Sequence, residues 1–330
     1  MTVLADDPRE APATLADPSA VAAADPWGDD LQLALYVALE LGFRGFAGVD
    51  DGWELHPATV GAVNALGEAF RAAVAAEVGP VVAGDARDVQ AQFVAMTTGD
   101  GPSLSRWMDE AGTIDQLREF AVHRSAYQLK EADQHTLALP RLAAGAGKAA
   151  YVEIQADEYG NGRPGAAHQE LFAATLRQLG LDDRYGAYLD LLPGPTLATV
   201  NLLSYFGRVR RWLGACVGHL ALFEMTSVGP MGRYADAVRR LTGSDAAARF
   251  YDVHVVADEH HQRLALDELV GPFVAAEPAM AADVVFGARA LTVVEGRFTD
   301  HLLSCWQHGR TSLRRPLDLD ENGVGCPAVA

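Results

Sequence analysis

Apolar residues recur along most of the chain at the three-to-four-residue spacing of helices that are buried on one face. This spacing predicts helices within residues 29–77, with a Gly/Asp-rich break near 45–52, and at 88–98, 114–135, 166–179, 195–226, 230–241, 244–269 and 278–305. No segment shows the alternating β-branched pattern between turn signals that predicts a strand. The pattern therefore predicts an all-α protein.

The two ends of the chain lack this periodicity. Residues 1–28 are rich in Ala, Asp and Pro, and we expect a disordered tail there. Residues 311–330 contain the polar stretch RRPLDLDENG and predict a second loose tail. No internal repeat or low-complexity linker divides the middle, so residues 29–310 are expected to form one domain that includes an N-terminal helical extension.

One predicted helix carries polar residues on the face that its apolar residues would bury. In FYDVHVVADEHHQRLALDEL (250–269), His254, Asp258 and His261 stand at i, i+4 and i+7, within an arc of roughly 60° on a helix. Burying two imidazoles and a carboxylate is costly unless they are paired or coordinated. His260 and Glu259 point away from this arc, and we expect His260 to be solvated or in a surface pair.

Three other segments place acids or histidines among apolar neighbours. Glu224 is the only carboxylate between residues 212 and 234. Glu158 and His168 are ten residues apart, and the three glycines and one proline between them rule out a regular helix across the interval. Glu131 lies on the predicted helix before them. A break after Glu158 would let two helical ends turn toward a common centre.

Carboxylates and imidazoles from four helical segments form the kind of ligand set that binds two iron ions. Both ligand types suit Fe(II), and helical bundles build such sites by projecting Glu and His side chains inward. The Glu-x-x-His pair of ferritin-like proteins is absent from these positions. The residues therefore indicate a di-iron scaffold of another kind.

The combined motif resembles the haem-oxygenase-like di-iron oxidase superfamily, often called iron-containing redox enzymes, and in particular its actinobacterial branch. The shared pattern is a Glu on one helix, then Glu-x9-His, then a Glu some thirty residues before a His-x3-Asp-x2-His helix. The stretches QLKEADQHTLALPRL and DEYGNGRPGAAHQELF also resemble this branch, and the resemblance extends over residues 29–310. The motif positions are filled by Glu131, Glu158, His168, Glu224, His254, Asp258 and His261.

This resemblance implies a haem-oxygenase-like helical bundle that holds two irons in its core in place of haem. Members activate O2 and hydroxylate amine nitrogens, cleave C–C bonds, desaturate or cyclise small amino-acid or fatty-acid substrates in specialised metabolism. It therefore implies an O2-dependent oxidoreductase that acts on a small amino-acid-like metabolite and receives electrons from an external donor. The fold commonly packs as a dimer, so the resemblance also allows a homodimer.

An amino-acid substrate would need a cationic partner for its carboxylate. Arg124 and Arg141 lie near the motifs, and the candidates for substrate binding are Lys130, Arg163 and Arg233. The sequence does not choose among them.

Other polar residues near the motifs are expected to have structural roles. His219 is predicted to be a core histidine bonded to the backbone. His135, one turn after the first Glu of the motif, is a candidate outer partner of that Glu. Asp157 and Glu153 flank the second Glu, and Glu153 would replace it only in a different helix register. Three tyrosines are predicted to pack in the core, namely Tyr127, Tyr151 and Tyr251.

Composition narrows the class of partner. The formal net charge of −18 over 330 residues argues against a nucleic acid or an anionic membrane surface. The three cysteines, Cys216, Cys305 and Cys326, are far apart and indicate reduced thiols in a cytoplasm. The N-terminus lacks a secretory signal pattern, and the longest apolar run (212–225) is too short and too polar to span a bilayer. We expect a soluble cytoplasmic protein.

Three alternatives compete with the amino-acid oxidase. One is a fatty-acid-type oxidative decarboxylase on the same scaffold, and another is a non-catalytic iron-binding or scaffold protein. The third is haem binding, for which haem oxygenases use a His on the first helix. The first credible helix here, LQLALYVALELGFRGF, contains no His, which argues against haem.

Overall fold

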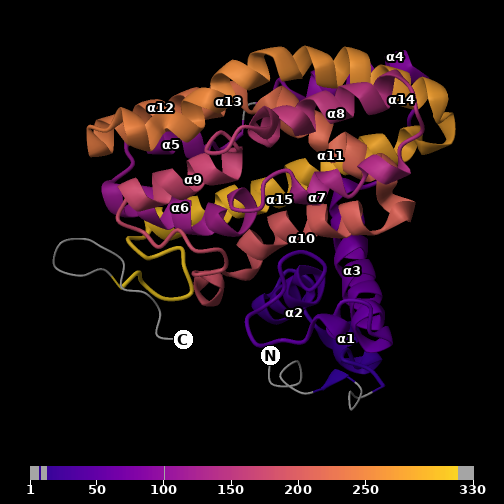
Figure 1. Ribbon diagram of the computed structural model, residues 1–330, viewed down its shortest axis with the longest axis horizontal. Coiled ribbons are helices and arrows are strands. Elements are labelled where there is room, and N and C mark those ends of the chain that lie inside the picture. Colours follow the sequence, from indigo (N-terminus) through magenta and orange to yellow (C-terminus); the bar gives the residue numbers. More distant parts are fainter. Residues whose placement is uncertain (1–6, 9–12, 100, 319–330) are drawn as a thin grey trace.

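The computed structural model describes residues 7–8, 13–99 and 101–318, which form fifteen α-helices joined by loops and by short 3-10 and π segments (Figure 1). No strand occurs within these described ranges. The all-α fold predicted from the apolar periodicity is therefore confirmed.

Three N-terminal helices lie together beneath the rest of the bundle in Figure 1: α1 (Pro18–Ala23), α2 (Asp29–Glu40) and α3 (Pro57–Val78). Helix α2 packs on α10 (Gly194–Arg208), and α3 packs on α2 and on α15 (Ala281–Gln307). The predicted break at 45–52 is the loop between α2 and α3. Helix α1 lies inside the segment that was predicted to be a disordered tail. The Asp17 side chain caps the start of this helix by accepting hydrogen bonds from two backbone N–H groups.

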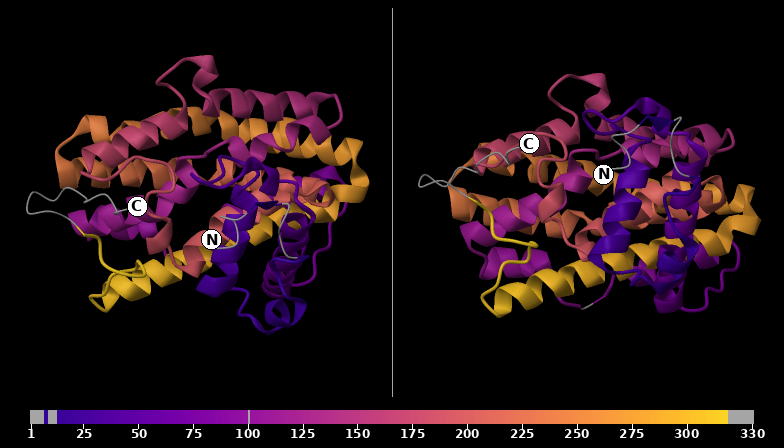
Figure 2. Two further views of the ribbon diagram at one scale, coloured as in Figure 1. Left: turned by 60° about the horizontal axis from the view of Figure 1, so that its bottom comes forward. Right: turned by 90° about the horizontal axis from the view of Figure 1, so that it is seen from below.

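The remaining helices form the main bundle, seen from two other sides in Figure 2. In chain order they are α4 (Ala86–Met96), α5 (Leu104–Glu110), α6 (Ile114–Gln128), α7 (Asp133–Thr136), α8 (Ala146–Glu158), α9 (His168–Gln178), α11 (Leu213–Thr226), α12 (Val228–Thr242), α13 (Asp245–Arg263) and α14 (Gly271–Ala276), with α10 and α15 as given above. Helices α5 and α8 and the short α14 lie outside the predicted helix ranges.

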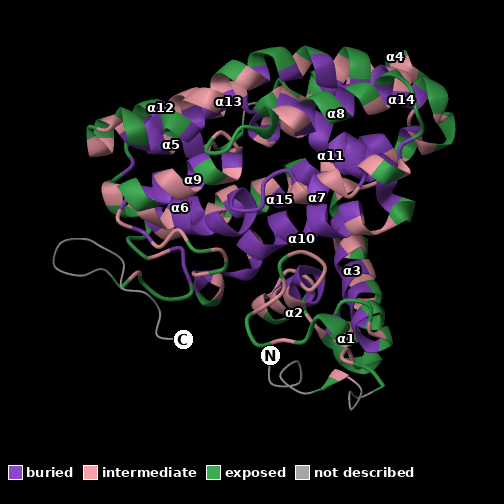
Figure 3. Cartoon of the chain, in the orientation of Figure 1, coloured by how far each residue is buried: buried purple, intermediate pink, exposed green. Residues whose placement is uncertain are grey.

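Helices α10 and α11 occupy the centre of the bundle and are buried around most of their circumference (Figure 3). Helix α11 packs along α15 at close range, with glycines at the contact. A Cβ atom on Gly218 would lie 1.9 Å from the carbonyl oxygen of Val284, and one on Gly287 would lie 2.0 Å from that of Ala215. Only glycine permits the two backbones to approach this closely.

Three predicted helices are interrupted in the structure. The segment 114–135 divides into α6 and α7, and 195–226 divides into α10 and α11 at a 3-10 turn, Arg210–Trp212. The segment 244–269 is α13 followed by a π-helical stretch, Leu264–Val270. Apolar periodicity continues through each interruption, so it gave no signal of them.

Part of the C-terminal segment predicted to be loose is packed against the bundle. Ser312 is buried, and its N–H and hydroxyl groups donate to Glu119 at 2.9 and 2.6 Å. The Ser312 hydroxyl also lies 2.9 Å from His123 Nε2. Residues 319–330, which include Cys326, lie outside the described residues. Among the described residues, Cys216 and Cys305 are free thiols, as predicted.

Candidate metal centre

A break between two helices brings Glu158 and His168 together. Glu158 is the last residue of α8 and His168 is the first residue of α9. Between them Gly160, Asn161 and Gly162 have positive φ angles of 63°, 53° and 72°, a conformation that glycine adopts at little cost. The predicted break after Glu158 is confirmed, and it turns both helix ends inward.

A second break positions Glu131, and the sequence did not predict it. Helix α6 ends at Gln128, and Ala132, which precedes α7, has a φ of 73°. A non-glycine residue in such a conformation costs on the order of 1–3 kcal/mol and persists where its surroundings hold it. On the other side of Glu131, Lys130 is held by a buried ion pair, in which its Nζ lies 2.7 Å from Glu40 Oε2. The chain is therefore fixed on both sides of Glu131.

Helix α13 presents His254, Asp258 and His261 on one buried face, as the i, i+4, i+7 spacing predicted. His254 Nδ1 lies 2.9 Å from the carbonyl oxygen of Phe250 and donates a hydrogen bond to it. Its Nε2 therefore faces the carboxylate of Glu131. Helix α11 contributes Glu224, which is 5% exposed. All seven residues of the predicted motif are buried.

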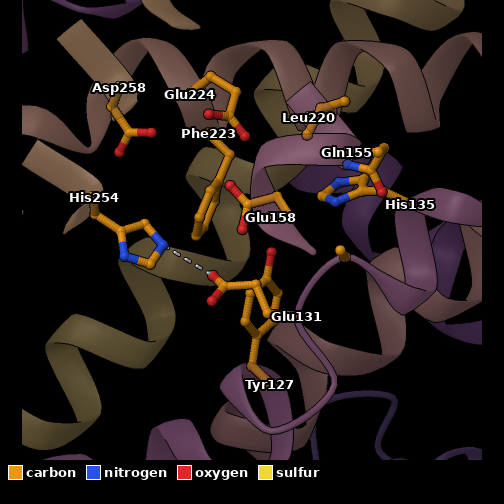
Figure 4. Close-up of a pocket in the computed structure, with 11 residues that line it drawn as sticks. Tyr127, Glu131, His135, Gln155, Glu158, Leu220, Phe223, Glu224, His254 and Asp258 are labelled. Carbon is orange, nitrogen blue, oxygen red and sulfur yellow. Dashed lines mark ion pairs between the residues drawn. The ribbon is translucent and has the colours of Figure 1, made fainter. Parts of the chain in front are cut away.

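Six of the seven residues fall into two overlapping groups. Each residue offers one nitrogen or carboxylate oxygen, and within a group all of these atoms lie within 4.8 Å of one another. Glu158 belongs to both groups. The first group is Glu131, Glu158, His168 and His254, and the second is Glu158, Glu224 and His261. Figure 4 shows Glu158 between Glu131 and Glu224.

The distances within these groups are short. His168 Nδ1 lies 2.7 Å from Glu158 Oε2, His261 Nδ1 lies 3.0 Å from Glu224 Oε2, and His254 Nε2 lies 3.5 Å from Glu131 Oε1. The cavity at this cluster has a volume of about 10 Å³, which is the size of one water molecule or ion.

Several of these atoms lack the hydrogen bonds that buried polar groups normally make. Glu131 Oε2, Glu158 Oε2, His168 Nδ1 and His254 Nε2 are buried, and no described residue offers them a partner of acceptable hydrogen-bond geometry. Leaving such atoms unsatisfied costs on the order of 1–3 kcal/mol each. Carboxylate oxygens and imidazole nitrogens that converge on an ion-sized space fit iron, which would satisfy all four atoms.

Electrostatics in the cluster are dominated by burial and by the proximity of opposite charges. Burial opposes the charge of Glu158, but His168 and the other imidazoles outweigh it and lower the pKa of Glu158 to about 2. Burial raises the pKa of Glu224 to about 8. Burial opposes protonation of His254 and His261, but the carboxylates facing them raise their pKa values to about 10 and 11. Without metal, protons therefore balance the carboxylates, and a metal ion would displace them.

Among the described residues, two side chains outside the predicted motif form hydrogen bonds with motif side chains. The Ser227 hydroxyl donates to Asp258 Oδ2 at 2.6 Å, and this bond orients Asp258 beside His261. Asp157 Oδ2 lies 3.1 Å from His261 Nε2. The sequence analysis placed Asp157 beside Glu158 and did not predict its contact with His261. Nothing in its spacing indicated the contact, because it depends on how α8 meets α13.

The structure confirms the prediction for His260 and contradicts the prediction for His219. His260 forms an exposed pair with Glu153 at 2.9 Å, as expected, and Glu153 is thereby directed away from the cluster. His219 was expected to bond to the backbone, but its Nδ1 lies 3.3 Å from His135 Nε2 and its Nε2 has no partner among the described residues. Burial lowers the pKa of His219 to about 4, so this buried pair is neutral. His135 also lines the cluster cavity.

The candidate cations lie in different places. Lys130 is buried in its ion pair with Glu40, and Arg141 donates to backbone carbonyls of residues 207 and 208, so neither is free to bind a substrate. Arg163 is exposed in the loop before α9. Arg124 and Arg233 line a second, larger cavity.

The helical fold and the buried carboxylate–imidazole cluster are those of a helical protein that can hold metal ions in its core. A family model described as iron-containing redox enzyme matches residues 118–295, which is more than half of the chain and spans all seven motif residues. The chain therefore belongs to the iron-containing redox enzyme family, as the sequence resemblance predicted. It is accordingly an oxidoreductase.

One similar protein is a nitrosourea synthase from Streptomyces achromogenes subsp. streptozoticus. The two chains are 26% identical over 132 residues, which is 40% of this chain and 28% of that protein. The match thus spans well under half of the relative's length. As to membranes, no individual helix in the described part of the chain combines the length and apolar character needed to cross a bilayer.

Proposed function

We propose that this protein is an O2-activating di-iron oxidase or oxygenase that acts on a small amino-acid-like metabolite in specialised metabolism. The observation that carries the proposal is the pair of overlapping ligand groups that share Glu158. A carboxylate between two sets of nitrogen and oxygen ligands is the arrangement that lets one residue bridge two metal ions. The similarity to a nitrosourea synthase supports a role in specialised metabolism.

In this proposal, Glu131, His168 and His254 would hold one iron and Glu224 and His261 the other, with Glu158 within reach of both. Asp258, fixed by Ser227, completes the ligand set beside His261. Two irons would supply electrons to O2 and the oxidising power to remove hydrogen from a substrate or transfer oxygen to it. The carboxylates supply the negative charge that favours higher iron oxidation states. An external electron donor, a homodimer and a cytoplasmic location stay predictions.

The test combines metal content with oxygen consumption. The protein is loaded anaerobically with Fe(II), freed of excess metal, and assayed for iron by mass spectrometry. We expect two irons per chain, and O2 uptake that a panel of amino acids and N-acylated amino acids accelerates. Fewer than one iron per chain would contradict the proposal, and two irons with no O2 uptake would favour the non-catalytic iron-binding alternative.

A fatty-acid-type oxidative decarboxylase on the same scaffold is the second candidate. The observation that favours it is the second cavity, of about 630 Å³, whose walls include Phe120, Phe172, Phe223 and Phe250. Adding straight-chain carboxylic acids to the O2-uptake panel separates the two candidates. Acceleration by the fatty acids alone would replace the amino-acid proposal with this one.

A further inference from the structure

The second cavity lies beside the metal cluster. Its volume of about 630 Å³ is within the range of sites that enclose drug-sized ligands, whereas the cavity at the cluster has room only for an ion or a water molecule. Phe223 lines both cavities, and Figure 4 shows its ring beside Glu158 and Glu224. A molecule in the larger cavity would therefore lie against Phe223, next to the cluster.

The walls of the larger cavity are built on the helices that carry the cluster. Phe172 follows His168 by one turn of α9, and Phe250 precedes His254 by one turn of α13. Their rings are in edge contact, with centroids 5.0 Å apart. The part of the cavity nearest the cluster is therefore aromatic and apolar, and it favours the apolar body of a ligand.

The charged residues in the cavity wall leave an excess of positive charge. Arg124 and Glu295 form a two-pronged ion pair at 2.9 and 2.6 Å, so they neutralise one another. Arg233 donates from Nε to Ser105 Oγ at 2.9 Å, and no carboxylate of the described residues pairs with its terminal nitrogens. Exposed Arg106 lines the same cavity. In a chain of net charge −18, this wall carries unpaired positive charge.

Two uncharged polar atoms in the wall also lack partners. Gln128 Oε1 and the Tyr251 hydroxyl are buried and have no hydrogen-bond partner in the described part of the chain, and both residues line the cavity. One can accept a hydrogen bond and the other can donate one. An amide group carries both the donor and the acceptor that these two atoms lack.

Building on the proposed function, we propose that this cavity binds the substrate as a net-anionic amphiphilic carboxylic acid. The carboxylate lies at Arg233, an uncharged amide contacts Gln128 and Tyr251, and the apolar body lies against Phe223 beside the cluster. An N-acylated amino acid with an apolar side chain has this chemistry. A free zwitterionic amino acid does not, because its ammonium group would meet no unpaired acid in the described wall.

The test is a binding series on the full chain by isothermal titration calorimetry, with and without anaerobic Fe(II). The ligands are N-octanoyl-L-leucine, its uncharged carboxamide, free L-leucine and octyl phosphate. We expect the acid to bind about 10- to 100-fold more tightly than the carboxamide, which is the usual value of a hydrogen bond to a charged group. We also expect free leucine to bind more weakly than the acid, because it lacks the octanoyl chain and carries an ammonium group. We expect octyl phosphate to bind more weakly than the acid.

Variants locate the anion site. Arg233→Gln should abolish the preference for acid over carboxamide, and Ser105→Ala, which removes the hydroxyl that orients Arg233, should weaken it a few-fold. Arg249→Gln is the matched control, because Arg249 is exposed on α13 and lies outside the cavity wall. Circular dichroism confirms that each variant is folded.

Equal affinities for acid and carboxamide in the unaltered protein would overturn this inference, and so would tightest binding of free leucine or of octyl phosphate. An equal loss of preference in the Arg249→Gln control would overturn the role of Arg233. Iron content, measured on the same samples, separates this inference from the proposed function. Two irons per chain without binding of the acid would refute the ligand assignment alone, whereas fewer than one iron would refute the di-iron site itself.

Discussion

Replacing Glu158 by Gln removes the one residue common to both ligand groups, so it should affect both metal ions. The substitution keeps the shape of the side chain and removes its charge. The matched control is Glu259→Gln, because Glu259 is exposed on α13, one residue after Asp258. Two further variants, His168→Asn and His261→Asn, each alter a residue that belongs to only one group.

The structure provides a scale for the effect. The cationic surroundings lower the pKa of Glu158 from 4.5 to about 2, which corresponds to about 3 kcal/mol of stabilisation of the carboxylate form. A divalent ion attracts this carboxylate at least as strongly as the imidazolium protons that it displaces. We therefore expect Glu158→Gln to raise the Kd of each iron by at least about 100-fold.

The assay is anaerobic equilibrium dialysis against a series of free Fe(II) concentrations, followed by measurement of bound iron. At a concentration that saturates the unaltered protein with two irons, Glu158→Gln should hold well under one. His168→Asn and His261→Asn should each retain about one, and Glu259→Gln should retain two. Two irons on Glu158→Gln with a Kd within tenfold of the unaltered value would refute the shared role of Glu158.

Three further predictions concern stability, measured as the free energy of unfolding in urea. Gly218→Ala should lower this free energy by about 2–3 kcal/mol, because the added Cβ would lie 1.9 Å from a backbone oxygen of α15. The control Gly296→Ala, on α15 with open space around it, should leave the free energy unchanged or raise it by up to about 1 kcal/mol. Equal losses in the two variants would refute the close-contact explanation. Lys130→Met should cost about 3–5 kcal/mol because it leaves Glu40 charged and buried, and adding Glu40→Gln should recover most of that loss; a double variant as unstable as the single one would count against the ion pair. Burial, together with the nearby His301 and Arg124, holds the pKa of His123 well below 6.5. As the pH falls below 6.5, the unfolded chain therefore binds a proton at this residue that the folded chain does not bind. Stability should therefore decrease by up to about 1.4 kcal/mol per pH unit from this group, and His123→Asn should remove that part of the slope between pH 7 and 5; an unchanged slope would exclude His123 as its source.

The sequence allowed good prediction where a feature depends on one helix. His254, Asp258 and His261 were assigned to one buried face from their spacing alone, and the structure places them there. The same spacing directed His260 outward to its surface pair with Glu153. The glycine-rich break after Glu158 was also predictable, because positive φ angles at glycine are a local property of the chain.

Features that depend on contact between helices were not predictable in this way. Asp157 reaches His261 from α8, and Ser227 reaches Asp258 from the junction of α11 and α12. Neither residue stands out in the sequence. Lys130 was a candidate for substrate binding because it lies next to Glu131, but the fold directs it to Glu40, ninety residues earlier in the chain.

By itself, the sequence determined the helical class of this protein, its family, and the seven polar residues that its core would have to accommodate. Because an α-helix repeats about every 3.6 residues, the spacing of residues in the sequence predicts which of them share a helix face. The tertiary structure alone decided that Glu158 is shared between two groups, that Ala132 adopts a positive φ beside Glu131, and that Arg233 faces a large cavity next to the cluster. Those outcomes depend on how closely helices pack, and a contact such as that at Gly218 is set by atoms that are far apart in the chain.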